Sequence, residues 1–397
     1  MSSATMIRNG LPDYRRALDP ADADAFGLAA TADIERFLAG RNDHAPTPLA
    51  ALPALANELG VGAIHIKDEG KRLGLGSFKA LGGAYAVIRL AVDAAAQALG
   101  RPVDIGEWRD PEVARAAANI TFACATDGNH GRSVAQGAQL VGAQCVIFVH
   151  AGVSEARCEA IARFDARIVR VEGDYDDSVA QAARAAEANG WTVVSDTSWP
   201  GYERIPRLVM QGYAVLLREA LEEIRAPPTH VFIQAGVGGI AATLAAHFSL
   251  AFGETRPFLT VVEPSRAACV FESARAGRPV KIARGPSTVM AMLECHEPSP
   301  VAWRILARAA DAFMTVDEED AVAVMRRLAF PRGGDPAIVA GESGGAGLAG
   351  LIKVANDPAL REQIALGPDA RVFLVNTEGA TDPALYETLV GVAPERI

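Results

Sequence analysis

Strand patterns and helix patterns alternate along most of this chain, and that alternation restricts its fold more than any other feature. From about residue 64 onward, short β-branched runs are followed by a turn containing Gly or Asp and then by an amphipathic helix pattern. Such an alternation predicts an α/β protein built from open, mostly parallel sheets that helices cover on both faces. We expect strands at 63–67, 120–125, 145–149, 167–171, 192–195, 231–234, 259–262 and 372–375. We expect helices at 77–99, 129–141, 154–164, 175–189, 203–225 and 239–251.

The length and composition limit the class of protein. A chain of 397 residues predicts two or three domains, and a break at Pro227-Pro228 interrupts the alternation. No apolar run approaches the ~20 residues that cross a bilayer, and the N-terminus lacks a secretory signal, so we expect a soluble cytoplasmic protein with no membrane partner. A formal net charge of −10 argues against a nucleic-acid partner.

The five cysteines are scattered, without the spacing of a zinc site. We therefore expect buried thiols and no metal, although a bridge between Cys269 and Cys295 stays open at this stage.

Ligands of open parallel sheets bind beyond the carboxyl ends of the strands, so the loops after the strands are candidate sites. The loop Gly74–Lys79 leads into a predicted helix, with Ser77 as a candidate N-cap and Lys79 in the first turn. A helix N-terminus is already positive and favours the neutral amine, which is the form that attacks an aldehyde. Most lysines at such a position are merely solvated.

Two further loops carry carboxylates, and a third carries a hydroxyl. The loop Thr126–Gly131 follows a strand and combines Asp127 with Asn129 at a helix start, where backbone N–H groups suit an anion. Asp196 follows another strand in the same way. Thr377 also follows a strand, where a hydroxyl is commonly just a cap. Each of these loops, taken alone, is equally compatible with turn chemistry.

The segment Gln234–Gly239 has the composition of a phosphate-binding loop. Its glycines allow backbone N–H groups to converge on an anion at the start of a helix. Gly236, Gly238 and Ala241 also satisfy the dinucleotide fingerprint, with Glu263 at the place of a ribose-binding acid. This segment alone therefore leaves a nicotinamide enzyme open.

Taken together, the motifs resemble a known family. GSFKALGGAYAV, which contains Lys79, is similar to the cofactor-lysine motif of the fold type II pyridoxal-phosphate enzymes, the threonine-dehydratase-like group. ATDGNHGRSVA resembles their asparagine loop and QAGVGG their phosphate loop, and the resemblance covers residues from about 44 to 383. The variants TDGNHG, SDTSWPGYE and NTEGATDP resemble the diaminopropionate ammonia-lyases, whereas the dehydratases generally have Ser or Ala in place of Asp127.

The resemblance implies a carbon–nitrogen lyase that uses pyridoxal 5'-phosphate to convert 2,3-diaminopropionate into pyruvate and two ammonia molecules. It implies a homodimer whose chain has a large cofactor-binding domain at 1–88 and 226–397, a small domain at 89–225, and an active site in the cleft between them. The implied catalytic residues are Lys79, Asp127 and Asp196. The implied cofactor-binding residues are Lys79, Phe78, Asn129, Gly236, Val237, Gly238, Gly239 and Thr377. The implied substrate-binding residues are Ser77, Thr126, Asp127, Gly128, His130 and Asp196.

Asp127 and Asp196 suit a substrate whose leaving group is an amine. A carboxylate can hold a β-ammonium group by charge-assisted hydrogen bonds, whereas a hydroxyl substrate has no such cation. The resemblance also implies that the aspartates act as acid or base, with Lys79 on one face of the substrate and an aspartate on the other, so that both enantiomers react. The alternatives are a serine or threonine dehydratase, a nicotinamide dehydrogenase, and a non-catalytic cofactor-binding sensor. Glu342 is either a site residue or a helix cap.

Overall fold

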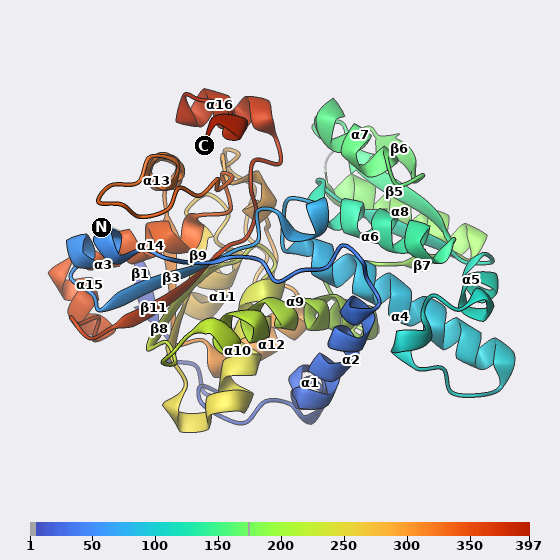
Figure 1. The fold of residues 1–397 in the computed structure, drawn as a ribbon, viewed down its shortest axis with the longest axis horizontal. Helices are drawn as coiled ribbons and strands as arrows, with labels where there is room; N and C mark the ends of the chain where they lie inside the picture. Colours follow the sequence, from blue (N-terminus) through green and yellow to red (C-terminus); the bar gives the residue numbers. More distant parts are fainter. Residues whose placement is uncertain (1–4, 174) are drawn as a thin grey trace. The chain divides into compact units, whose positions relative to one another are not determined.

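The computed structural model describes residues 5–173 and 175–397, which form two compact units (Figure 1). The first unit comprises the chain up to Phe26 together with Pro46–Lys71 and Leu216–Ile397. The second unit comprises Gly27–Ala45 and Arg72–Val215.

A seven-stranded sheet forms the centre of the first unit, in the order β1-β10-β9-β8-β11-β3-β2. The five inner strands are parallel, and the short edge strands β1 and β2 run antiparallel to their neighbours. The strands are β1 Met6–Arg8, β2 Leu49–Ala51, β3 Ala63–Asp68, β8 His230–Gln234, β9 Phe258–Pro264, β10 Ala312–Val316 and β11 Arg371–Asn376. Every residue of β8 is buried, as expected for a central strand of a covered parallel sheet.

Helices surround this sheet (Figure 1). The helices of the first unit are α1 Pro20–Phe26, α3 Pro53–Leu59, α10 Gly239–Phe252, α11 Cys269–Ala276, α12 Pro300–Ala309, α13 Glu318–Ala329, α14 Ala346–Ala355, α15 Pro358–Gln363 and α16 Pro383–Val390. Short 3₁₀ turns lie at Gly253–Thr255, Ala291–Leu293 and Pro394–Arg396. Helix α14 is buried along almost its whole length and packs on β8, β9 and β10, so it lies in the main hydrophobic core.

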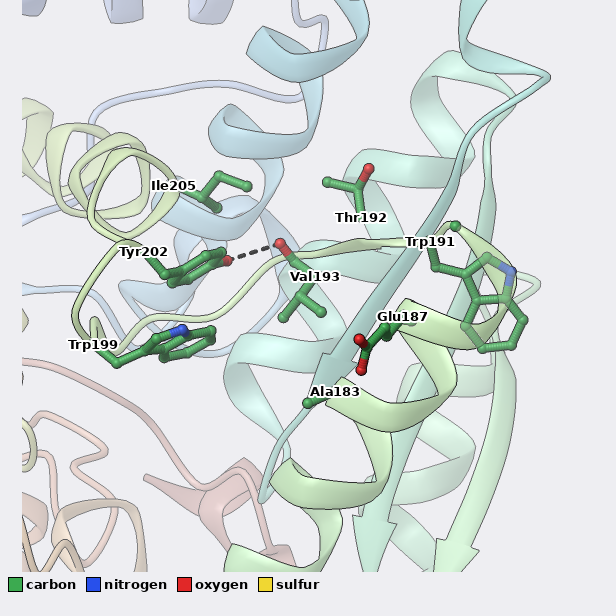
Figure 2. A pocket seen from close by; sticks show the side chains of 10 residues that line it. Ala183, Glu187, Trp191, Thr192, Val193, Trp199, Tyr202 and Ile205 are labelled. Atoms are coloured by element: carbon green, nitrogen blue, oxygen red, sulfur yellow. Dashed lines mark hydrogen bonds between the residues drawn. The ribbon is translucent and has the colours of Figure 1, made fainter.

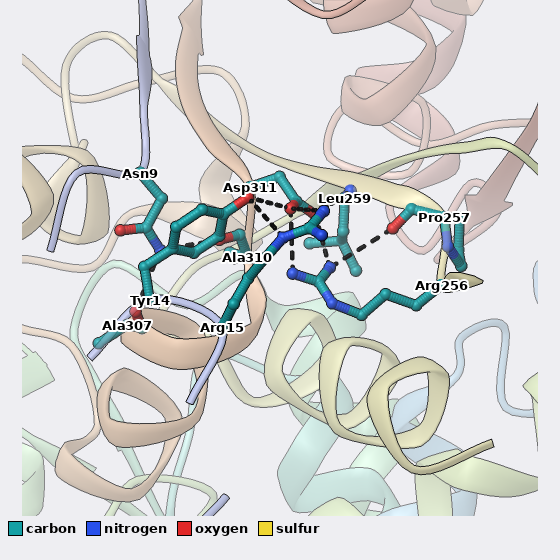
Figure 3. Close-up of polar contacts among 9 residues, drawn as sticks. All are labelled: Asn9, Tyr14, Arg15, Arg256, Pro257, Leu259, Ala307, Ala310 and Asp311. Atoms are coloured by element: carbon teal, nitrogen blue, oxygen red, sulfur yellow. Dashed lines mark hydrogen bonds and ion pairs between the residues drawn. The ribbon is translucent and has the colours of Figure 1, made fainter. Parts of the chain in front are cut away.

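A buried carboxylate fastens the N-terminal segment to the first unit (Figure 3). Asp311, whose side chain is fully buried, accepts two hydrogen bonds from Arg256 at 2.6 and 3.0 Å and one from the Leu259 backbone at 2.9 Å. The Tyr14 hydroxyl also donates to it at 2.5 Å. Burial and the hydrogen bond to Asp311 raise the pKa of Tyr14. Asp311 is thus a structural charge whose acceptor capacity is satisfied.

A four-stranded parallel sheet forms the centre of the second unit, in the order β6-β5-β4-β7. Its strands are β4 Thr121–Ala125, β5 Gln144–His150, β6 Arg167–Val171 and β7 Thr192–Val193. Its helices are α2 Leu28–Ala39, α4 Lys79–Leu99, α5 Pro111–Ala117, α6 Asn129–Val141, α7 Glu155–Ala162 and α8 Tyr175–Asn189. Helix α9, Arg204–Glu223, begins in this unit and ends in the first one. Short 3₁₀ turns lie at Arg72–Gly74 and Ile105–Glu107.

Helices α4 and α6 pack closely because glycines face the contact. A Cβ on Gly83 would lie 2.8 Å from the side chain of Ser133, and one on Gly137 would lie 2.8 Å from the Cα of Ala84. Such distances are too short for a real side chain, so the spacing of the two helices depends on both glycines. The start of α4 and the start of α6, which carry Lys79 and Asn129, belong to this packed pair.

The predicted α/β alternation with mostly parallel sheets is confirmed, since each predicted strand and helix has a counterpart within a few residues. The compact units follow other boundaries than the predicted domains, because 27–45 and 72–88 lie in the second unit and 216–225 lie in the first. A cut at residue 88 would divide the continuous helix α4, which packs along α5 and α6. The assignment of a large cofactor-binding domain and a small domain stays a prediction.

Candidate active site

Lys79 is the first residue of helix α4, as predicted, but Ser77 does not cap that helix. The residue before the helix is Phe78, which makes no side-chain cap hydrogen bond, and the buried Ser77 hydroxyl has no hydrogen-bond partner among the described residues. The N-cap interpretation of Ser77 is therefore wrong. Ser77 is instead a buried polar side chain two residues before the lysine.

The amine of Lys79 forms an ion pair with the carboxylate of Asp196, and both side chains are mostly buried. Burial by itself raises the pKa of Asp196, but the nearby Lys79 charge, His130 and the hydrogen bond from Lys79 outweigh it and hold that pKa below its usual value. The Lys79 amine also lies 5.4 Å from the ring centroid of Phe78 and 5.8 Å from that of Tyr213. The sequence pattern indicates only the helix field at Lys79 and gives no sign of this ion pair, because Asp196 lies 117 residues away in the chain.

The loop that carries Asp196 is closed by a tyrosine that sequence reasoning missed. The Tyr202 hydroxyl donates to the carbonyl oxygen of Val193 at 2.8 Å (Figure 2). It also accepts from the backbone N–H of Ser195 at 3.1 Å. Its ring stacks on Trp199, with centroids 3.9 Å apart, and the backbones of Trp199 and Tyr202 also pair. The hydroxyl of Tyr202 thus ties the chain after Asp196 to the chain just before it.

A surface pocket of about 580 Å³ lies beside this loop, within the second unit (Figure 2). It is lined by Ala183, Ala186, Glu187, Gly190, Trp191, Thr192, Val193, Trp199, Tyr202 and Ile205. None of the predicted catalytic residues is among them, so the pocket and the chemistry-bearing residues are distinct features of the same unit.

The predicted asparagine loop follows β4 and leads into α6, which begins at Asn129. The Thr126 hydroxyl accepts hydrogen bonds from the backbone N–H groups of Gly128 and Gly131, both at 3.0 Å, and so shapes the turn. Gly128 has a φ of +147°, which a residue with a side chain rarely adopts. Asp127 lies on this turn, and its Oδ1 is 3.0 Å from Nε2 of His150.

His130 joins the asparagine loop to the Asp196 loop. Its Nε2 lies 3.0 Å from the carbonyl oxygen of Val194, which can only accept, so Nε2 carries the proton. Burial lowers the pKa of His130, so the ring is neutral near pH 7. Its other nitrogen, Nδ1, is buried and has no hydrogen-bond partner among the described residues.

The glycine-rich loop of the first unit connects β8 to α10, as predicted. Gly238 precedes the helix with a φ of +98°, and a Cβ there would lie 3.2 Å from Ala302 and Leu306. A Cβ on Gly236 would lie 3.0 Å from the sulfur of Cys295. The first backbone N–H groups of this 14-residue helix have no acceptor within the helix, and a helix N-terminus of this kind suits a phosphate.

Thr377, after β11, is oriented by a glutamine that sequence reasoning did not single out. The amide nitrogen of Gln234 donates to Thr377 Oγ1 at 2.8 Å. Carbonyl oxygens of Ser343, Gly344 and Val375 lie 3.3, 2.6 and 3.2 Å from the same nitrogen, which fixes the orientation of the amide. Because Thr377 Oγ1 accepts from Gln234, its own proton remains to donate to a neutral acceptor such as a pyridine nitrogen.

Glu263, the candidate ribose acid, has a structural role instead. Its two carboxylate oxygens accept the backbone N–H groups of Val270 and Phe271, at 2.8 and 2.6 Å, at the start of α11. Burial raises the pKa of Glu263 to about 8. Its acceptor atoms are thus occupied by the helix, and the dinucleotide interpretation loses its acid.

The sequence also makes predictions about the cysteines, about metal ligands and about apolar helices. Cys124, Cys145, Cys158 and Cys269 are buried free thiols, as predicted, whereas Cys295 is only partly buried. Cys269 and Cys295 are both free, so the bridge between them does not form. Within residues 5–173 and 175–397, no group of three or more His, Cys, Asp or Glu side chains could hold a metal ion. In the same residues, no helix is both long and apolar enough to cross a membrane. Glu342 is buried.

A family comparison, a comparison with characterised proteins and a comparison with solved structures all point to the same group of enzymes. Residues 41–378 match the family described as "Pyridoxal-phosphate dependent enzyme". The diaminopropionate ammonia-lyase of Escherichia coli strain K12 is 40% identical over 354 residues, which cover 87% of each chain. The enzyme of the same description from Salmonella typhimurium strain LT2 is 38% identical over 358 residues, 88% of each chain. A crystal structure of the Escherichia coli enzyme in complex with an aminoacrylate-PLP azomethine reaction intermediate matches with a TM-score of 0.86 and 37% identity, over 97% of this chain and 96% of that one.

Proposed function

The chain belongs to the pyridoxal-phosphate dependent enzymes, and on that premise we propose that it is a diaminopropionate ammonia-lyase. It is a carbon–nitrogen lyase with pyridoxal 5'-phosphate as cofactor, and it converts 2,3-diaminopropionate by α,β-elimination into pyruvate and two ammonia molecules. The relatives of that description cover most of this chain, and the matching crystal structure holds a cofactor-bound reaction intermediate.

The ion pair between Lys79 and Asp196 is the observation that carries this proposal. Asp196 is a carboxylate at neutral pH that needs a cation beside it, because its desolvation is offset mainly by the charge of Lys79. The β-ammonium of a diaminopropionate would supply Asp196 with a cation while the Lys79 amine serves the cofactor and the proton transfer. A serine or threonine substrate offers no such cation, which favours the lyase over the dehydratase alternative.

The residues of each unit fit the cofactor. When bound, pyridoxal phosphate acts as an electron sink that stabilises the carbanion left after the Cα proton is removed. In the second unit, Lys79 would hold its aldehyde carbon, Phe78 would lie against it, and Asn129 would bind its 3-hydroxyl oxygen. In the first unit, the loop Gly236–Gly239 would hold its phosphate through backbone N–H groups, and the oriented hydroxyl of Thr377 would donate to its ring nitrogen.

Lys79, Asp127 and Asp196 divide the proton transfers among them. Lys79 removes the Cα proton on one face of the substrate, and an aspartate does so on the other face. The aspartates also hold the β-ammonium, which leaves as ammonia without a separate protonation step. The substrate would also contact the residues beside these three, which are Ser77, Thr126, Gly128 and His130.

The test is a panel of amino acids assayed for pyruvate and ammonia. The expected result is the highest kcat/KM for 2,3-diaminopropionate, with two ammonia molecules released per pyruvate, and loss of both products in Lys79→Ala. Equal or better turnover of serine or threonine, with one ammonia per 2-oxo acid, would identify the dehydratase alternative. Absence of any turnover by a cofactor-loaded protein would favour the sensor.

Cellular location and assembly are part of the same proposal. We expect a cytoplasmic homodimer without nucleic-acid or membrane partners. Light scattering of the holoenzyme measures the mass in solution, and a mass equal to one chain of 41.6 kDa would contradict the homodimer.

A further inference from the structure

Asp127 has a neighbour, His150, that no sequence motif indicated. Asp127 lies just beyond the end of β4, and His150 is the last residue of the adjacent parallel strand β5. Ala125 of β4 pairs with Phe148 of β5, and each of the two residues lies two positions beyond its member of that pair. The register therefore brings both side chains to the same edge of the second unit's sheet. There His150 Nε2 lies 3.0 Å from Asp127 Oδ1, with both side chains partly exposed.

The protonation of the His150 ring follows from its second contact. The backbone N–H of Gly152 donates to His150 Nδ1 at 3.1 Å. A ring nitrogen that accepts a hydrogen bond carries no proton, so in the neutral imidazole the proton is on Nε2. His150 Nε2–H thus donates to the Asp127 carboxylate, and this hydrogen bond is charge-assisted.

Gly152 supplies space as well as a donor. A Cβ at this position would lie 2.9 Å from Cε1 and 3.1 Å from Nδ1 of His150. Any side chain there would push the imidazole away and break its hydrogen bond from the Gly152 N–H. The segment His150–Gly152 is therefore shaped to hold the ring in one orientation.

We propose that His150, held by Gly152, is a positioning residue for Asp127. It engages Oδ1 of the carboxylate, holds the carboxylate in one orientation, and leaves Oδ2 to exchange a proton with the substrate or to bind its β-ammonium. The proposal rests on the role of Asp127 in the proposed function. Asp127 and Asp196 are then held by different means, since Asp196 is paired with Lys79 and lies on the loop closed by Tyr202.

Two matched substitutions at position 150 separate positioning from mere packing. The amide nitrogen of Gln reaches about as far as Nε2, so His150→Gln can still donate to Asp127. The shorter Asn places its amide near the position of Nδ1 and cannot reach the carboxylate, so His150→Asn loses the contact. Gly152→Ala displaces the ring without removing it, and His296→Leu in the first unit controls for loss of a histidine.

The kinetic test measures kcat and KM of the holoenzyme with each enantiomer of 2,3-diaminopropionate. For the enantiomer that Asp127→Asn impairs, we expect kcat/KM to fall about 10- to 100-fold in His150→Asn and Gly152→Ala, the amount expected for one hydrogen bond to a charged group. His150→Gln and His296→Leu should retain activity near that of the wild type. His150→Asn should cost nothing further in the Asp127→Asn background. Equal losses in His150→Asn and His150→Gln, or losses that multiply in the double variant, would overturn the proposal.

A second readout does not depend on the substrate. Nitrogen-15 NMR of histidine-labelled holoenzyme reports which ring nitrogen of His150 carries the proton. We expect the Nε2–H tautomer in the wild type and its loss in Gly152→Ala, while an Nδ1–H ring in the wild type would refute the inference. If diaminopropionate were not a substrate at all, the proposed function would fail, and the tautomer would still show whether His150 donates to Asp127.

Discussion

Removal of the Tyr202 hydroxyl should loosen the loop that carries Asp196. Tyr202→Phe deletes two hydrogen bonds, to Val193 and Ser195, but keeps the ring stack on Trp199 and the backbone pairing. At about 1 kcal/mol net for each hydrogen bond, the closed loop loses up to about 2 kcal/mol, equivalent to about 30-fold in population. Because the loss of one such bond corresponds to about 5-fold and the loss of both to about 30-fold, we expect kcat/KM for diaminopropionate to fall between about 5- and 30-fold.

The assay is steady-state kinetics of the holoenzyme, followed by pyruvate formation. The matched control is Tyr386→Phe, since the buried hydroxyl of Tyr386 has no hydrogen-bond partner among the described residues and its loss should leave kcat/KM unchanged. An unchanged kcat/KM in Tyr202→Phe, or an equal loss in both variants, would refute the reasoning that the hydroxyl positions Asp196.

Three further predictions concern Asp196, the phosphate loop and Glu263. Asp196→Asn removes the charge that pairs with Lys79, so turnover of diaminopropionate should fall more than turnover of serine, whereas equal losses would show that Asp196 does not recognise the ammonium. Gly238→Ala places a Cβ at a φ of +98° and 3.2 Å from Ala302, so cofactor binding should weaken by up to about 100-fold in a titration followed by absorbance. The control is Gly253→Ala, at the open far end of the same helix, which should leave cofactor binding unchanged. Glu263 has a folded-state pKa of about 8, above the ordinary value of 4.5, so the folded state binds more protons between these values and stability should fall as pH rises from about 5 to 8. Glu263→Gln should flatten that slope in thermal unfolding, and an unaltered slope would assign it to other groups.

Local patterns in the sequence were sufficient for most of the fold. Buried strands such as β8 have continuous apolar runs, and their flanking glycines mark the turns, so the alternation could be recognised without knowledge of contacts. The strand β10 was missed because Ala312–Val316 lies between two helices as a short run without a turn signal, and its identity as a strand comes from pairing with β9 and β1.

The candidate site was predictable where residues lie next to each other in the chain, and only there. Lys79, Asp127 and Asn129 stand in recognisable loops, but the partners that control them are distant in sequence. The ion pair of Lys79 with Asp196 spans 117 residues, and the contact of His150 with Asp127 spans 23.

At Glu263, in contrast, the sequence suggested a ligand-binding residue and the structure shows a helix-capping one. Its spacing from the glycine-rich loop suited a ribose, yet its oxygens are used by the start of α11. Periodicity and spacing in a sequence do not show whether a carboxylate already accepts hydrogen bonds from the protein itself, whereas the structure shows those hydrogen bonds.

The pairing of β3 with β11 also has a consequence for synthesis on the ribosome. Asp68 at the end of β3 meets Asn376 at the end of β11, which is 308 residues later in the chain. At about 5–20 residues per second, β3 waits roughly 15–60 s for its partner strand while its apolar residues stay uncovered. The second unit's strands are all translated within that interval. We therefore expect the nascent N-terminal segment, including β3, to depend on chaperone protection during that interval.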